Sequence, residues 1–129
     1  MAAPKTTTRL LPLAWLFVSL KGRISRGIYW LAYVFLLAVN AVLVGQLIGG
    51  AEASYARLAD VLAPFVVVAT LYANIAITAK RLHDIGYSGF LALALLVPFV
   101  NFVFTIWVGI VPGTAGANRY GEFTDRQPA

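Results

Sequence analysis

The sequence contains no cysteine, which excludes disulfides, thiolate metal sites and catalysis by a thiol. Charged residues are also scarce, because they make up 12% of the chain, against about 25% in ordinary soluble domains. Hydrophobic residues make up 60%. A chain of 129 residues cannot hide that much apolar surface in one soluble core. We therefore expect a membrane protein whose apolar residues face lipid.

Acidic residues are fewer than basic ones, with five Asp and Glu against ten Lys and Arg. In a soluble protein such an excess is compatible with nucleic-acid binding. Here the basic residues flank apolar segments, so anionic lipid headgroups are the expected counter-charge. We do not expect nucleic acid as a partner.

Three apolar runs are long enough to cross a bilayer, and they cover residues 28–48, 58–79 and 90–111. A helix of about 20 residues spans the hydrocarbon core. The runs are continuous and lack the alternation of barrel strands, so they predict helices.

A fourth apolar run, residues 10–20, is too short to span. A signal peptide is disfavoured here because the basic stretch KGRISR follows the run and no small-residue cleavage site is present. We expect a helix that lies in the interface or dips into it. The predicted fold is an all-α membrane protein, a single domain over residues 1–129. It has three transmembrane helices and a short N-terminal interfacial helix.

The basic residues predict the orientation of the spans. Five of them precede the first span without an acid between them: Lys5, Arg9, Lys21, Arg23 and Arg26. Because positive residues stay on the cytoplasmic side, the N-terminus and the 80–89 loop are predicted to be cytoplasmic. Three spans then place the C-terminal tail outside. The alternative is that Pro98 marks a hairpin that returns the tail to the cytoplasm.

The most charged short stretch is AKRLHDIGYSGF, residues 79–90. We expect Lys80 and Arg81 to extend the second helix into water. His83 and Asp84 are adjacent and point in different directions on a helix, which argues against general base catalysis by this pair. Asp84 is instead predicted to pair with Arg23 or Arg26.

Residues 21–30, KGRISRGIYW, have two interpretations. The simpler one is positive-inside anchoring followed by an aromatic belt. The alternative is a site for a lipid phosphate, because Arg23 and Arg26 lie three residues apart and guanidinium groups bind phosphate through two parallel hydrogen bonds.

Few polar residues lie within the predicted spans, chiefly Asn40, Thr70, Asn74 and Asn101. Hydrogen bonds between helices are the favoured interpretation. Asn40 and Asn101 lie at similar depth, so a contact between them is one prediction. The alternative is a solute path, which would require an oligomer because three helices enclose little space.

Three stretches together resemble the DUF805 family of small bacterial inner-membrane proteins: GRISRGIYW, RLHDIGYSG and NRYG, in this order. The resemblance covers roughly residues 15–121. It implies a bacterial inner-membrane protein of unknown function, with no established reaction or cofactor. Ile28 and Phe90 depart from the residues that many relatives carry, which puts in doubt an ion pair just before Tyr29.

The sequence therefore predicts a non-enzymatic membrane protein with no catalytic residue, metal or cofactor. A cytoplasmic-side cluster is predicted to bind anionic lipid headgroups or a membrane protein partner, with a homo-oligomer as a further option. Its members are Arg23, Arg26, Lys80, Arg81, His83 and Asp84. The alternative function is a small-solute or ion transporter or channel subunit. A lipid-modifying enzyme that uses His83 and Asp84 is the least favoured interpretation.

Overall fold

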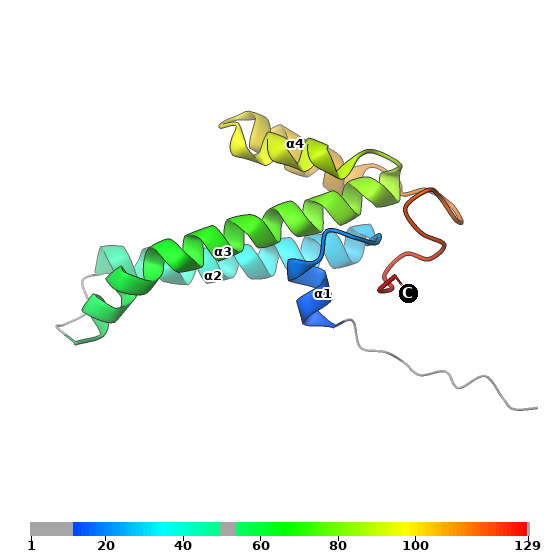
Figure 1. Ribbon diagram of the computed structural model, residues 1–129. Coiled ribbons are helices and arrows are strands. Elements are labelled where there is room, and N and C mark those ends of the chain that lie inside the picture. Colours follow the sequence, from blue (N-terminus) through cyan, green and yellow to red (C-terminus); the bar gives the residue numbers. More distant parts are fainter. Residues whose placement is uncertain (1–11, 50–53, 129) are drawn as a thin grey trace, which may run out of the picture.

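The computed structural model describes residues 12–49 and 54–128, which form helices joined by loops (Figure 1). The predicted all-α class is confirmed for these residues. The elements, in chain order, are α1 (Leu13–Val18), α2 (Arg26–Gly49), α3 (Ser54–Ile85), the 3-10 helix η1 (Gly89–Leu96) and α4 (Val100–Ile110). Helix α1 lies within the run predicted to be interfacial, whose first two residues are outside the described part of the chain.

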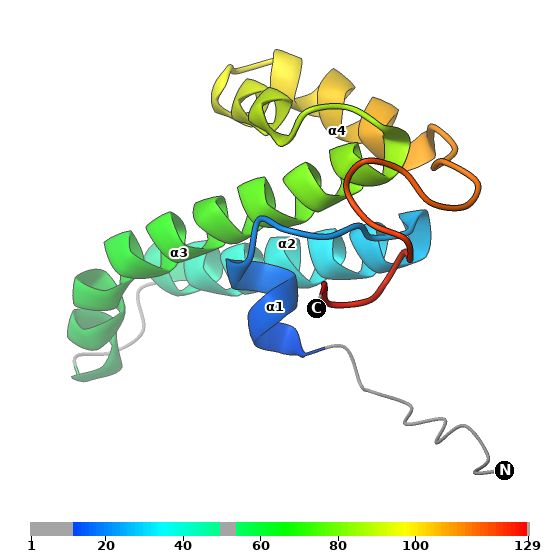
Figure 2. The same ribbon diagram turned by 45° about the vertical axis from the view of Figure 1, so that its right-hand side comes forward.

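Helices α2 and α3 lie side by side as a long antiparallel pair (Figures 1 and 2). Both are long and apolar enough to cross a membrane. The 24 residues of α2 extend about 36 Å, which exceeds the roughly 30 Å of hydrocarbon. Most of the apolar side chains of α2 face outward, and Leu31 on α2 and Phe65 on α3 are each about 70% exposed. Outward-facing apolar side chains of this kind are typical of helices that contact lipid.

Helix α3 continues past its apolar run and ends at a Schellman motif. The amide of Tyr87 donates to the Leu82 carbonyl at 2.8 Å, and that of Gly86 donates to the His83 carbonyl at 3.2 Å. Gly86 has φ +99°, a left-handed conformation that favours glycine. The chain therefore turns at Gly86 and leaves α3.

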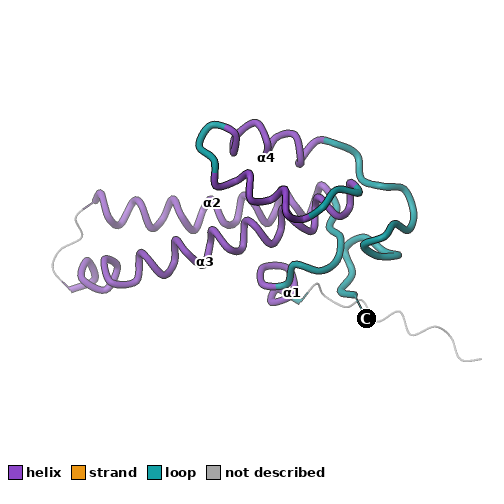
Figure 3. Tube along the Cα trace, turned by 45° about the horizontal axis from the view of Figure 1, so that its top comes forward, coloured by secondary structure: helices purple, strands orange, loops and turns teal. Residues whose placement is uncertain are grey.

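The third predicted span, residues 90–111, is wrong as a single crossing helix. Ser88 begins η1 by accepting a hydrogen bond from the Phe90 amide at 3.4 Å, and η1 ends before Pro98. Phe99 has φ +66°, which reverses the chain, and α4 returns beside η1 (Figure 3). Each arm is about 16 Å long, half the thickness of the hydrocarbon core. The alternative of a hairpin at Pro98 describes the structure.

The other elements gather around the C-terminal half of α3. Helix α1, η1 and α4 all contact α3, and α4 also contacts α2. The residues buried at this meeting point include Trp15, Tyr29, Ile77, Leu82 and Val108. The C-terminal tail folds back beside the segment that joins α1 to α2 (Figure 2). The tail is thereby placed at the same end of the molecule as the 80–89 turn.

Candidate functional site

A buried carboxylate clamped by two arginines lies at this meeting point. Arg23 Nη2 is 2.9 Å from Asp84 Oδ1, and Arg81 Nη1 is 2.5 Å from Asp84 Oδ2. Arg23 is 1% exposed, Arg81 is 0% exposed and Asp84 is 4% exposed. The predicted contact between Asp84 and an N-terminal arginine is therefore confirmed, with Arg23 as the partner. Each carboxylate oxygen of Asp84 faces one guanidinium group, which compensates the negative charge of this buried side chain.

The remaining donors of Arg23 bind the C-terminal tail. Its Nη1 donates to the carbonyls of Gly116 at 2.7 Å and Gly121 at 2.9 Å, and its Nη2 donates to that of Thr114 at 2.9 Å. The Thr124 hydroxyl donates to Asp84 Oδ1 at 2.7 Å. One arginine therefore joins the start of α2, the end of α3 and the tail.

Arg81 binds the carbonyl groups at the end of α4. Its Nε donates to Val108 O at 3.1 Å and its Nη2 donates to Val111 O. Because the last carbonyls of a helix lack partners within the helix and carry partial negative charge, a cation stabilises this end. The side chain that was predicted to enter water instead fixes the return arm of the hairpin.

Lys80 binds backbone carbonyl groups in α1 and directly after it. Its ammonium group donates to the carbonyls of Trp15, at 3.2 Å, and Ser19, and it lies 5.4 Å from the centre of the Trp15 ring. Lys80 is 0% exposed. The expectation that Lys80 and Arg81 extend into water is wrong, because α1 and α4 bring carbonyl groups to them.

His83 and Asp84 point to different partners, as their adjacency predicts. His83 Nδ1 lies 3.1 Å from the Gly22 carbonyl, and the ring stacks on Tyr120 with 4.1 Å between ring centres. Asn118 donates to the His83 carbonyl at 2.8 Å. The imidazole therefore helps to hold the tail, whereas the Asp84 carboxylate binds the two arginines.

The three stretches that carry the family resemblance meet at this site. Arg23 belongs to the first, Asp84 to the second and Gly121 to the third, and all three are linked through the Arg23 side chain. The tail forms a tight turn, with mutual backbone hydrogen bonds of 3.1 Å between Asn118 and Gly121. Three crossings place the tail on the opposite side of the membrane, so the prediction of three spans excludes this convergence. The available signal was NRYG, because it belongs to the same set of stretches as those that contain Arg23 and Asp84.

The exposed charges surround this buried network. Arg26, the remaining basic member of the predicted cluster, is exposed and donates to the Ile110 carbonyl at 3.3 Å. Lys21, Arg119 and Arg126 are exposed as well. We call these four residues the basic rim. Glu122 is the exposed acid among the described residues of this end.

The polar side chains within the long helices bond chiefly to one another and to the backbone. Thr70 donates to Asn40 Oδ1 at 3.3 Å across the α2–α3 pair, while Asn40 and Asn74 each donate to a carbonyl one turn earlier. The predicted interhelical hydrogen bond is therefore present. Asn40 has Thr70 as its partner across the pair, whereas Asn101 accepts from Thr105 at 3.2 Å.

Comparison with known proteins assigns a family. Residues 17–122 match the family described as "Protein of unknown function (DUF805)". Inner membrane protein YhaI of Escherichia coli K12 is 36% identical over 107 residues, which cover 82% of this chain and 86% of YhaI. Inner membrane protein YhaH of the same strain is 26% identical over 124 residues, which cover 87% of this chain and 92% of YhaH. Uncharacterized protein YiiR of the same strain is 32% identical over 136 residues, and the match covers 85% of this chain and 88% of YiiR. No solved structure matches significantly.

Proposed function

The chain belongs to the DUF805 family and is similar to YhaI and YhaH, which are named inner membrane proteins, and we propose for it a binding function in the bacterial inner membrane. The basic rim binds anionic phospholipid headgroups, and no chemical reaction is involved. The buried network of Arg23, Arg81 and Asp84 holds the rim in place and does not itself contact lipid.

The distribution of exposed charge supports this proposal. The basic rim brings four cations to one end of the molecule, where Glu122 is the exposed acid among the described residues. The described residues at the far end of α3 carry Arg57 and Asp60, whose charges cancel. Each base near an anionic membrane surface contributes about 1 kcal/mol to binding. By the positive-inside rule the rim faces the cytoplasm, together with the N-terminus and the tail.

Replacing rim arginines tests the proposal. Purified protein is titrated with phosphatidylglycerol and, separately, phosphatidylcholine, and native mass spectrometry measures the lipid retained. The wild type is expected to prefer phosphatidylglycerol. Arg119→Gln/Arg126→Gln should lose about fivefold of that preference for each arginine.

Arg57→Gln is the matched control, because it removes an exposed arginine from the other end of α3. It should keep the wild-type preference. An Arg119→Gln/Arg126→Gln protein with the same lipid preference as the wild type would overturn the proposal. Retention of a protein partner, lost in the same variant while lipid preference stays unchanged, would assign the rim to that partner instead.

Solute transport, the alternative function, stays a prediction. Asn40 and Thr70 serve each other as hydrogen-bond partners, which is a packing role that needs no solute.

A further inference from the structure

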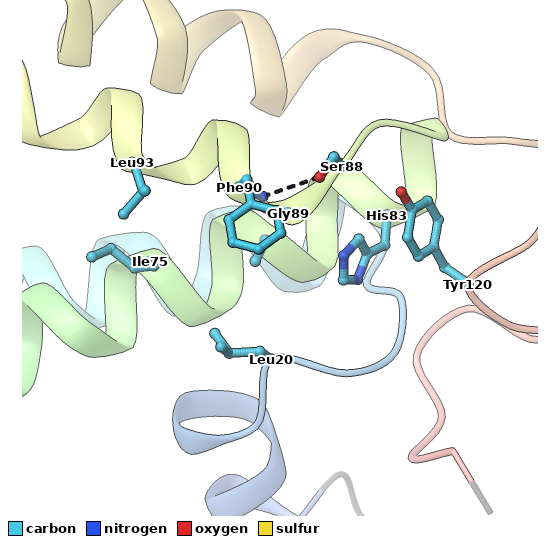
Figure 4. A pocket seen from close by; sticks show the side chains of 9 residues that line it. Leu20, Ile75, His83, Ser88, Gly89, Phe90, Leu93 and Tyr120 are labelled. Carbon is cyan, nitrogen blue, oxygen red and sulfur yellow. Dashed lines mark hydrogen bonds between the residues drawn. The ribbon is translucent and has the colours of Figure 1, made fainter.

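A pocket of about 420 Å³ lies between α3, η1 and the segment after α1 (Figure 4). This volume is within the range of about 300–1,000 Å³ typical of ligand sites. Its walls are mainly apolar: Leu20, Ile75, Ala79, Phe90 and Leu93. The pocket is separate from the buried arginine network, and the basic rim lies beside one of its ends.

The two ends of the pocket differ in chemistry. Figure 4 shows the rings of His83 and Tyr120 at one end, whereas Ile75 and Leu93 lie at the other. Along α3, His83 follows Ile75 by eight positions, which corresponds to about 12 Å along the helix axis. An occupant must therefore be elongated and apolar over most of its length, with a polar group at the His83 end.

The apolar wall faces outward as well as into the pocket. Phe90 is 84% exposed and Leu93 is 51% exposed. On a helical hairpin that packs against a membrane-crossing helix, such residues face lipid. A hydrocarbon chain can therefore enter the pocket from the side without passing through water.

The polar end carries positive charge. The Arg119 guanidinium carbon lies 4.7 Å from the centre of the Tyr120 ring, and Arg119 is exposed. Lys21, also exposed, follows the pocket residue Leu20 directly in the chain. A phosphate at this end would lie beside two cations of the basic rim, which gives charge complementarity for a phospholipid.

We infer that the pocket holds one acyl chain of a membrane phospholipid whose headgroup lies at Arg119 and Lys21. This inference rests on the proposed function and adds a defined place for the chain. The pocket fixes where the lipid sits, and the rim selects its headgroup. Loss of the pocket should therefore weaken every phospholipid equally, whatever its headgroup charge.

The test fills the pocket from two sides. Leu93→Trp places a larger side chain on the η1 wall, and Leu20→Trp does so on the opposite wall. Leu96→Trp is the control, because Leu96 lies on the same helix, is 53% exposed and does not line the pocket. Circular dichroism and the apparent melting temperature establish that each variant is folded.

Native mass spectrometry then measures retention of phosphatidylcholine and phosphatidylglycerol. Displacing about two methylene groups should weaken retention of both lipids about tenfold in each pocket variant. The ratio between the lipids should not change, and Leu96→Trp should match the wild type. A phosphatidylcholine labelled with a photoreactive group in its chain should crosslink to the pocket walls in the wild type and not in Leu93→Trp.

The outcomes separate the two proposals. Wild-type phosphatidylcholine retention and crosslinking in folded Leu93→Trp and Leu20→Trp would overturn the pocket inference and leave the rim intact. Absence of a phosphatidylglycerol preference in the wild type would overturn the proposal that the basic rim binds anionic headgroups. Retention of phosphatidylcholine by the pocket variants would still test the pocket inference. Dimerisation abolished by Leu93→Trp with lipid retention unchanged would assign the pocket to a second copy of the chain.

Discussion

At the scale of single residues, Asp84 joins more of the molecule than any other acid described in the structure. Its carboxylate binds Arg23, Arg81 and Thr124, while its backbone carbonyl accepts from the Thr114 amide at 2.7 Å. Gly113 passes so close that an added Cβ would lie 2.8 Å from the carboxylate carbon. Replacing a buried acid that has this many partners should therefore destabilise the fold.

Asp84→Asn should lower the apparent melting temperature sharply. The change leaves two buried guanidinium groups without a counter-charge, which typically costs about 3–5 kcal/mol. Intrinsic tryptophan fluorescence during heating in detergent measures the shift. Asp60→Asn, at an exposed acid of the far end, should melt like the wild type. The same melting temperature for both variants would show that the two ion pairs of Asp84 contribute little to stability.

The sequence predicted part of this network. An acid among many bases indicated the contact between Asp84 and Arg23, because opposite charges in a dry environment pair. It did not predict that Lys80 and Arg81 are buried. Their partners are backbone carbonyls of α1 and α4, and carbonyls occur at every position of a sequence, so no residue type marks them.

At the scale of elements, the hairpin of η1 and α4 is the main departure from the prediction. A run of 22 apolar residues satisfies the length criterion for a span whether or not it bends in the middle. The deciding features are Pro98, which has no amide hydrogen to continue a helix, and the left-handed backbone of Phe99. Hydropathy reports neither, so the sequence left both topologies open.

Cysteine labelling distinguishes the two topologies, and the absence of native cysteine makes single replacements clean. Lys21→Cys and Glu122→Cys should react with a membrane-impermeant maleimide from the same side of a vesicle, because the hairpin returns the tail. Asp60→Cys should react only from the opposite side. Reaction of Glu122→Cys together with Asp60→Cys would restore three crossings and contradict the hairpin.

At the scale of the whole molecule, three distant stretches close one end. The backbone amide of Asp125 donates to the Arg23 carbonyl at 2.9 Å, and its carboxylate accepts from the Ser25 amide, just before α2, at 2.7 Å. Asp125 has φ +60°, a conformation that asparagine and aspartate tolerate better than most residues. The tail is therefore a structural part of the site.

Replacing Asp125 should separate the role of its oxygen from that of its charge. Asp125→Ala removes the acceptor at the start of α2 and should cost about 1 kcal/mol, whereas Asp125→Asn keeps an acceptor and should cost less. Thermal unfolding of both variants measures the difference. If Asp125→Ala and Asp125→Asn melt alike, the hydrogen bond to Ser25 does not stabilise the tail.

The half-length hairpin gives the protein two unequal cross-sections. In a bilayer crossed by α2 and α3, one leaflet contains only this pair, while the other also accommodates α1, η1 and α4 around the end of α3. The molecule would consequently be broader in one leaflet than in the other. Insertion in this arrangement would displace unequal numbers of lipids from the two leaflets and would set up a lateral tension that bending of the bilayer relieves.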